Sequence, residues 1–149
     1  LGMFNKTRSL GFGTEVKRRI LLGTLNLSTA YYDTYYTEAL KIRTLNKQDF
    51  DQAFEKFDCL LTPTAPTTAF KLGEKADDPL AMYQSGAACT APVNLAGVPA
   101  LSLPFGMVGV MPVGLQLIGR HFAEKTLLRV GYTFEQNTDQ TVLKPGLAG

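Results

Sequence analysis

Near its beginning the chain carries the stretch Gly11-Phe12-Gly13-Thr14-Glu15-Val16-Lys17-Arg18-Arg19-Ile20-Leu21-Leu22-Gly23-Thr24. Phe12, Val16 and Ile20 recur at the spacing of one helix face, and Gly23 is a plausible stop. We therefore predict a helix over residues 12–22. Because Gly11-Phe12-Gly13 has no strand before it, this stretch is interpreted as the entry turn of the helix and not as a phosphate-binding loop.

Arg19 is the candidate binding residue of this helix. Successive helical residues are rotated by about 100°, which places Arg19 beside the apolar stripe and Arg18 on the opposite side. An inward guanidinium needs a partner, and its planar fork matches a carboxylate. That carboxylate is either Glu15, one turn earlier, or the carboxylate of a bound ligand. The residues alone leave both alternatives open.

A longer amphipathic pattern follows. It opens on Tyr31-Tyr32-Asp33-Thr34-Tyr35-Tyr36, and apolar residues then continue at intervals of mostly three and four up to Phe57. This pattern predicts a long helix that Ser28 caps and that bends near Asn46. Tyrosine pairs at helical spacing are more typical of core and interface packing than of a stacking platform for bases.

Strand signals begin after this helix. The apolar run Cys59-Leu60-Leu61 predicts a buried strand that leads into an extended loop at residues 62–66. Asp78-Pro79 has the composition of a helix start, with Asp as the N-cap and Pro in the first turn.

The last third of the chain predicts a β-hairpin and a helix. Alternating patterns at 99–104 and 113–119 indicate two strands joined by a glycine-rich turn at 106–112. Residues 124–136 indicate a helix packed on this hairpin, and the turn-rich segment 137–149 indicates a flexible tail. The fold class is α/β or α+β, with too few strands for a large sheet. We expect the chain to complete a sheet whose other strands lie in a missing N-terminal part.

Composition places the chain among globular proteins and excludes several functions. It has 149 residues, of which 45% are hydrophobic and 19% charged. The formal net charge is only +2 and the basic residues are dispersed, which argues against a broad nucleic-acid surface. No apolar run approaches the roughly 20 residues that span a bilayer, so we expect no membrane partner and a cytoplasmic or organelle-matrix location. Since the chain begins at Leu1, we expect its start to be a cut inside a larger protein.

The sequence offers no recognisable catalytic or metal-binding set. His121 has no second histidine with which to build a metal site, and it is expected to be a surface or structural histidine at a strand end. Cys59 and Cys89 form no metal-ligand spacing and are expected to be reduced, buried thiols. The serines lie in neither a G-x-S-x-G nor an S-x-x-K context. We therefore assign no catalytic residue and no metal ligand to this chain.

Six blocks, in this order, resemble the amidase signature family over nearly the whole chain. They are Gly11-Phe12-Gly13-Thr14-Glu15-Val16-Lys17-Arg18-Arg19-Ile20, Tyr31-Tyr32-Asp33, Lys41-Ile42-Arg43-Thr44-Leu45, Thr62-Pro63-Thr64-Ala65-Pro66, Pro92-Val93-Asn94-Leu95-Ala96-Gly97-Val98-Pro99 and Pro112-Val113-Gly114-Leu115-Gln116-Leu117-Ile118-Gly119. The P-T-A-P and P-V-G-L-Q blocks are similar to amidases in general. The E-V-K-R-R-I and Y-Y-D blocks resemble the branch of glutamine-hydrolysing A subunits of tRNA-dependent amidotransferases.

This resemblance implies a fold and an incomplete active site. Residues 1–149 would be the C-terminal part of one amidase domain, whose mixed β-sheet core is flanked by helices. The family's catalytic Lys, cis-Ser and Ser nucleophile lie in a Gly/Ser-rich signature of the N-terminal half, and nothing like that signature occurs here. The chain alone is therefore expected to be inactive.

The resemblance also implies partners. The parent would hydrolyse glutamine, or another small amide, and supply ammonia to a partner that amidates ATP-activated glutamyl-tRNA(Gln). The partners would be subunits B and C of the amidotransferase. The tRNA, ATP and Mg²⁺ would be bound by the partner subunit, and no cofactor is expected in this chain.

Two positions connect the resemblance to a substrate. The second Arg of the K-R-R block, Arg19, would bind the carboxylate of glutamine. The family's acidic residue for the substrate amino group follows a Met-Tyr pair, but here Met82-Tyr83 is followed by residues 84–88 without Asp or Glu, in a loop one residue longer up to Pro92. This departure keeps open a general amidase for an amide without a free amino group. A further alternative is a non-catalytic assembly fragment whose helix and aromatic surface dock a partner.

Overall fold

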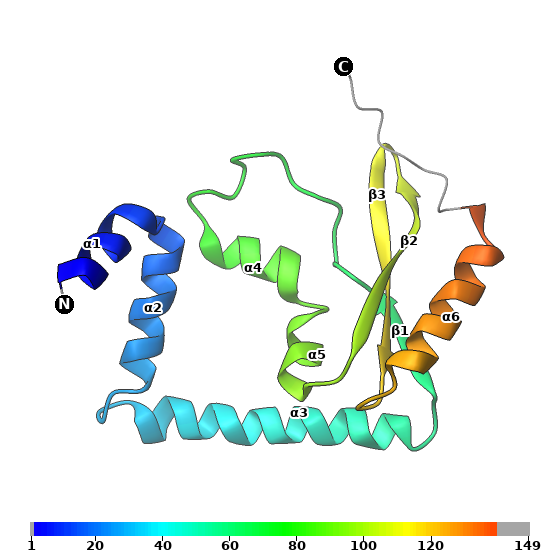
Figure 1. The fold of residues 1–149 in the computed structure, drawn as a ribbon, viewed down its shortest axis with the longest axis horizontal. Coiled ribbons are helices and arrows are strands. Elements are labelled where there is room, and N and C mark those ends of the chain that lie inside the picture. The colour runs from blue at the N-terminus through cyan, green and yellow to red at the C-terminus, as the bar shows by residue number, and fades with distance from the viewer. Residues whose placement is uncertain (1, 140–149) are drawn as a thin grey trace. The chain divides into compact units, whose positions relative to one another are not determined.

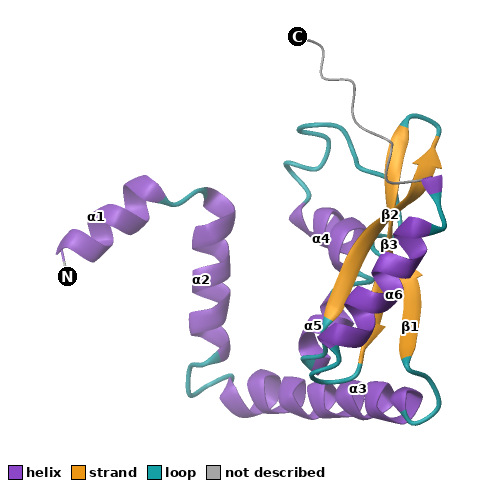
Figure 2. Cartoon of the chain, turned by 45° about the vertical axis from the view of Figure 1, so that its right-hand side comes forward, coloured by secondary structure: helices purple, strands orange, loops and turns teal. Residues whose placement is uncertain are grey.

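The computed structural model describes residues 2–139 and divides the chain into two compact units, residues 1–43 and 44–149. Figures 1 and 2 show the labelled elements, and each unit is described by itself. None of the described helices is both long enough and apolar enough to cross a membrane. The expected flexible tail lies outside the described residues from position 140 onward.

The first unit is helical. It contains α1 (Gly2–Gly11), α2 (Thr14–Asn26), the π-helix η1 (Tyr32–Thr37) and the first residues of α3 (Glu38–Phe54). The sequence did not predict α1. Helix α2 also continues past Gly23, because a helix tolerates one interior glycine at a cost of about 1 kcal/mol.

The junction before α3 differs from the prediction. Ser28 does not cap a helix; its hydroxyl donates to the carbonyl of Leu25 at 2.7 Å. The tyrosines meet in pairs, with ring centroids 5.6 Å apart for Tyr31 and Tyr35 and 4.9 Å apart for Tyr32 and Tyr36. Tyr31, Tyr32 and Tyr35 are exposed, so they do not pack in a core of this unit, and the expected role in interface packing stays a prediction.

Helix α3 is uninterrupted at the predicted bend. Asn46 lies inside the α-helix, and its side-chain Nδ2 donates to the carbonyl of Pro92 at 2.7 Å. The polar residue that suggested a bend therefore serves a tertiary contact. The irregular turn lies earlier in the chain, in η1.

The second unit is built on a small antiparallel sheet. Its strands β1 (Cys59–Pro63), β2 (Ala100–Val108) and β3 (Met111–Gly119) have the order β1-β3-β2. Its helices are α4 (Pro79–Ala87), α5 (Ala91–Ala96) and α6 (Glu124–Gln136), besides the end of α3. The predicted strand after α3, the hairpin and the last helix are confirmed. The strand is not buried as predicted, because none of its residues is buried and Leu61 is 60% exposed. The described strands pair only in antiparallel fashion, so the expected mixed sheet is not what this part of the chain forms.

Helix α4 begins where the sequence predicted. The Asp78 carboxylate accepts from the backbone N–H of Ala81 at 3.0 Å, and Pro79 lies in the first turn. The cap satisfies one of the N–H groups that a helix start leaves without a partner.

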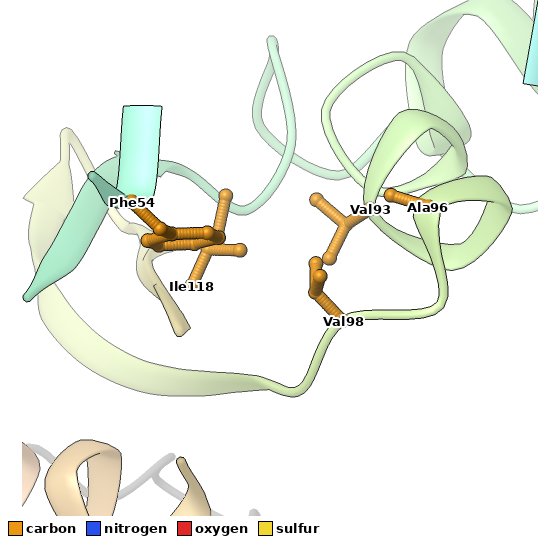
Figure 3. Packing of buried hydrophobic residues seen from close by; sticks show 5 residues of the cluster. All are labelled: Phe54, Val93, Ala96, Val98 and Ile118. Atoms are coloured by element: carbon orange, nitrogen blue, oxygen red, sulfur yellow. The ribbon is translucent and has the colours of Figure 1, made fainter. Parts of the chain in front are cut away.

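The sheet carries apolar layers on both faces. On one face Leu103 and Leu117 pack against Leu127 of α6. On the other face Ile118 belongs to a buried cluster with Phe54 of α3, as Figure 3 shows. The other members lie in α5 or just after it: Val93, Ala96 and Val98. Figure 1 shows α6 on one side of the strands and α5 on the other.

Close packing of α6 depends on two glycines. A Cβ atom on Gly131 would lie 2.9 Å from Leu101 Cδ2, and one on Gly119 would lie 3.1 Å from Leu127. Both distances are too short for ordinary contacts, so glycine at these positions lets the helix approach the sheet.

Two neighbouring leucines of α6 test this packing. Leu127 is 3% exposed and Leu128 is 62% exposed. We expect Leu127→Ala to lower the free energy of unfolding by about 2–5 kcal/mol, since it removes buried methyl groups and leaves a cavity. Leu128→Ala should change it by less than about 1 kcal/mol. Urea titration followed by circular dichroism measures both, and equal losses would contradict the assigned packing.

Candidate functional site

Arg19 lies on α2, where it pairs with Glu15. Its Nε donates to Glu15 Oε1 at 3.0 Å, and Arg18 donates to both oxygens of the same carboxylate at 2.8 and 2.9 Å. The Arg19 side chain is 55% exposed and that of Arg18 is 41% exposed. The expected inward Arg19 and outward Arg18 are therefore not observed. Positions three and four apart on a helix are both neighbours, so one carboxylate reaches both guanidinium groups.

The first unit does not give α2 a buried face. Val16 and Ile20 of the predicted apolar stripe are exposed, and α2 has no buried residue. The predicted apolar stripe is therefore not buried against other described residues of this unit. A ligand-binding role for Arg19 stays a prediction, and the structure supplies the Glu15 pairing that the sequence had offered as its alternative.

His121 lies just after β3, as the sequence indicated. Its Nε2 is buried and has no hydrogen-bond partner among the described residues. The ring lies near Gly97, where a Cβ atom would come within 3.9 Å of Cε1. Residues 2–139 contain no group of three His, Cys, Asp or Glu residues that could hold a metal ion. Both cysteines are free and half-buried, rather than fully buried as expected.

The second unit carries a row of polar side chains on the sheet face opposite α6. This polar row consists of Gln116, Thr62, Thr64 and Ser102. Gln116 of β3 is 4% exposed, and its Nε2 donates to Thr62 Oγ1 at 2.9 Å and to the carbonyl of Cys89 at 3.0 Å. Both amide hydrogens of Gln116 are thus used. The row ties β1, β3 and the segment before α5 together by hydrogen bonds.

The polar row ends in a pair of hydroxyl groups. Thr64 Oγ1 lies 2.8 Å from Ser102 Oγ, and either atom can be the donor. The backbone N–H of Thr64 also donates to the carbonyl of Gly114 at 2.9 Å. A Cβ atom on Gly114 would lie 2.8 Å from Thr64 Oγ1 and 3.1 Å from Ser102 Oγ, so only glycine leaves room for this pair.

The hydroxyl pair lines a cavity of about 570 Å³. Its wall is formed by the loop after β1, the end of α4 and the β2–β3 hairpin: Thr64, Ala65, Thr67, Thr68, Ala69, Phe70, Ser85, Gly86, Ser102, Leu103, Pro104, Pro112, Val113 and Gly114. Pockets of this size with a mostly apolar lining and a few convergent polar groups are typical small-molecule sites. The cavity is therefore the candidate site of this unit.

The chemistry available in the cavity is hydrogen bonding. The lining residues include hydroxyl groups and backbone groups but no Lys, Arg, His, Asp or Glu. General acid–base catalysis needs a titratable group within reach of the reacting atoms. The described lining can thus bind and orient a ligand, and it supplies no base for a nucleophile.

Sequence reasoning missed this site. It treated residues 62–66 as an extended loop and 99–119 as a hairpin, without pairing their polar residues. A signal was present, because Thr62, Thr64, Ser102 and Gln116 interrupt apolar strand patterns at alternating positions. The partners lie 38 positions apart for Thr64 and Ser102, so the sequence alone does not pair them.

Relatives of known identity match almost the whole chain. It is 64% identical over 143 residues to the A subunit of glutamyl-tRNA(Gln) amidotransferase from Desulforamulus reducens, a match that covers 96% of the chain and 29% of that relative. It is 63% identical over 145 residues to the corresponding A subunit from Moorella thermoacetica, a match that covers 97% of the chain and 30% of that relative. The chain therefore spans about three tenths of the length of these relatives.

A solved structure gives the same result for the fold. The crystal structure of the A subunit of glutamyl-tRNA(Gln) amidotransferase from Thermotoga maritima superposes with a TM-score of 0.69 at 45% sequence identity. The match covers 91% of this chain and 29% of that one. The sequence profile of the Amidase family matches residues 1–128. The chain therefore belongs to the amidase family.

Proposed function

We propose that this chain is part of a glutamine-hydrolysing amidase subunit of a tRNA-dependent amidotransferase. The observation that carries the proposal is the 64% identity to an amidotransferase A subunit over 96% of the chain. In this proposal the parent protein hydrolyses glutamine, and the released ammonia converts Glu-tRNA(Gln) to Gln-tRNA(Gln). The antiparallel sheet and its helices form one part of the amidase domain.

The catalytic Lys, cis-Ser and Ser belong to another part of the parent protein in this proposal. The described residues support that division, because the candidate cavity contains no titratable side chain. Subunits B and C are the proposed partners, and tRNA is bound through the partner subunit. ATP and its Mg²⁺ are also assigned to the partner in this proposal.

The first test concerns the isolated chain. We expect no glutamine-dependent ammonia release from residues 1–149 alone, because the nucleophile and its base are contributed from elsewhere in the parent. A coupled glutamate dehydrogenase assay measures this, with the full-length parent as the positive control. Ammonia release that scales with the concentration of the repurified chain would overturn this division of the active site.

Arg19 is the proposed ligand for the substrate carboxylate. Its ion pair with Glu15 is exposed, and exposed pairs stabilise a protein by only about 0–1 kcal/mol. A ligand carboxylate can therefore replace or share the Glu15 contact at little cost in stability. The guanidinium fork would then bind that carboxylate through two hydrogen bonds.

The second test exchanges each arginine for lysine in the parent. We expect Arg19→Lys to raise KM for glutamine by about tenfold or more, since the charge remains but the bidentate geometry is lost. KM for an amide without a carboxylate should stay nearly unchanged. Arg18→Lys is the matched control, as both side chains contact Glu15. Equal effects of the two variants on both substrates would assign Arg19 a purely structural role.

A general amidase that acts on another small amide is the second candidate function. The observation that favours it is the uncharged lining of the cavity at Gly86, where the family resemblance implies an acidic residue nearby. A substrate ammonium group would find no carboxylate among these lining residues.

The third test adds that carboxylate. Gly86 has no atom within 4 Å of an added Cβ, so the first atom of a side chain can be placed there without a clash. If the parent acts on an amide that lacks an amino group, Gly86→Asp should shift kcat/KM towards glutamine by about tenfold, the magnitude of a charge-assisted hydrogen bond. If the wild-type parent already prefers glutamine and Gly86→Asp does not increase that preference, the general amidase is excluded.

A further inference from the structure

We propose that Gln116 is a positioning residue for the cavity wall that α4 supplies, and that it acts through the connection between α4 and α5. The Gln116 side chain is not among the residues that line the cavity. It acts on a ligand only by fixing the place of Ser85 and Gly86, the two lining residues of α4. The effect on catalysis rests on the proposed amidase function, whereas the anchoring follows from the structure itself.

Gln116 joins three segments of the second unit. It lies on the middle strand β3 and is 4% exposed. One amide hydrogen bonds to Thr62 of β1, and the other bonds to the carbonyl of Cys89, which lies 27 positions earlier in the chain. An apolar side chain would fill this buried position without any need for partners. The amide adds a directional contact to the Cys89 carbonyl that an apolar side chain cannot make.

A second side-chain amide holds the other end of the same connection. Asn46 of α3 is half-buried, and its Nδ2 donates to the carbonyl of Pro92 at 2.7 Å. The carbonyls of Cys89 and Pro92 are therefore bonded to side chains from two different elements, β3 and α3. This arrangement fixes the connection relative to both the sheet and α3.

Helix α4 itself has little packing that could fix its position. None of its residues is buried, whereas α5 contributes the buried Val93 and Ala96 to the core. The hydrogen bonds of the Asp78 carboxylate and of the Ser85 hydroxyl stay within the helix and its cap. The position of the end of α4 therefore depends strongly on the connection that follows it.

The connection carries its own position to the cavity wall. Figure 1 shows α4 leading through a short connection into α5. The backbone N–H of Thr90 donates to the carbonyl of Ala87 at 3.1 Å, and Ala88 has helical dihedral angles. This hydrogen-bonded turn moves together with Gly86, which lies three residues before Cys89. Displacement of the Cys89 carbonyl would thus displace the wall and leave the cavity less preorganised for a ligand.

The first measurement is hydrogen–deuterium exchange of the full-length parent, followed by mass spectrometry. Gln116→Met keeps the length of the side chain and removes both N–H donors. We expect the exchange of residues 79–90 to become about fivefold faster, since one anchoring hydrogen bond of the connection is lost. The exchange of residues 124–136 in α6, on the other face of the sheet, should stay nearly unchanged.

The second measurement is glutamine hydrolysis by the same variant. Gln116→Met should raise KM for glutamine about fivefold, the effect of one neutral hydrogen bond, and change kcat by less than about twofold. A purely structural role would give a different result. It would lower the fraction of folded enzyme, and therefore the apparent kcat, without a change in KM.

A second variant and a control assign the effect to the connection. Asn46→Ala leaves Gln116 in place and releases the same connection from α3, so it should raise both the exchange of residues 79–90 and KM. It decides the question if Gln116→Met disturbs the fold. Asn137→Ala removes an exposed amide that donates to the carbonyl of Thr133 one turn earlier, and it should change neither value.

The outcomes separate this inference from the proposed function. The inference is overturned if residues 79–90 exchange at the wild-type rate in both variants, or if their exchange rises while KM for glutamine stays at the wild-type value. Either result leaves glutamine hydrolysis by the parent standing. A parent that hydrolyses no glutamine refutes the proposed function, and faster exchange of residues 79–90 then still assigns the anchoring to Gln116.

Discussion

Everything in the second unit depends on the burial of two adjacent residues of β3, Leu117 and Ile118, on opposite faces of the sheet. They are 1% and 2% exposed. Successive strand residues point to opposite faces, so this dipeptide joins the layer of α6 to the layer of α3 and α5. β3 is also the middle strand, and both other strands bond to it. A slip of one residue would move each side chain into the wrong layer.

The same alternation creates the candidate site. Gln116 shares the face of Ile118, and Gly114 lies two residues further from the core. Along this face the contacts change from apolar packing at Ile118, to a buried amide at Gln116, to the hydroxyl pair over Gly114. Burying an amide is tolerable only because both of its N–H groups are bonded. The core thus fixes the position of the cavity floor.

In the first unit, the proposed function concerns exposed charged side chains. Arg18 and Arg19 share one carboxylate, and such surface pairs stabilise a protein only slightly. A guanidinium in such a pair can therefore bind a ligand without a large loss of stability. The cavity of the second unit differs, because its uncharged groups are fixed by the strands that carry them.

Local patterns in the sequence determined much of the secondary structure. A short apolar run predicted β1, and alternation predicted the hairpin. Helical spacing predicted α2 and α6, and Asp78-Pro79 predicted the start of α4, because each pattern lies within a few neighbouring residues. Tertiary structure alone decided the pairing of β1 with β3, the contact of Asn46 with Pro92 and the meeting of Thr64 with Ser102. Those contacts join residues 38 or more positions apart, and they form only when the two faces of the sheet are buried together.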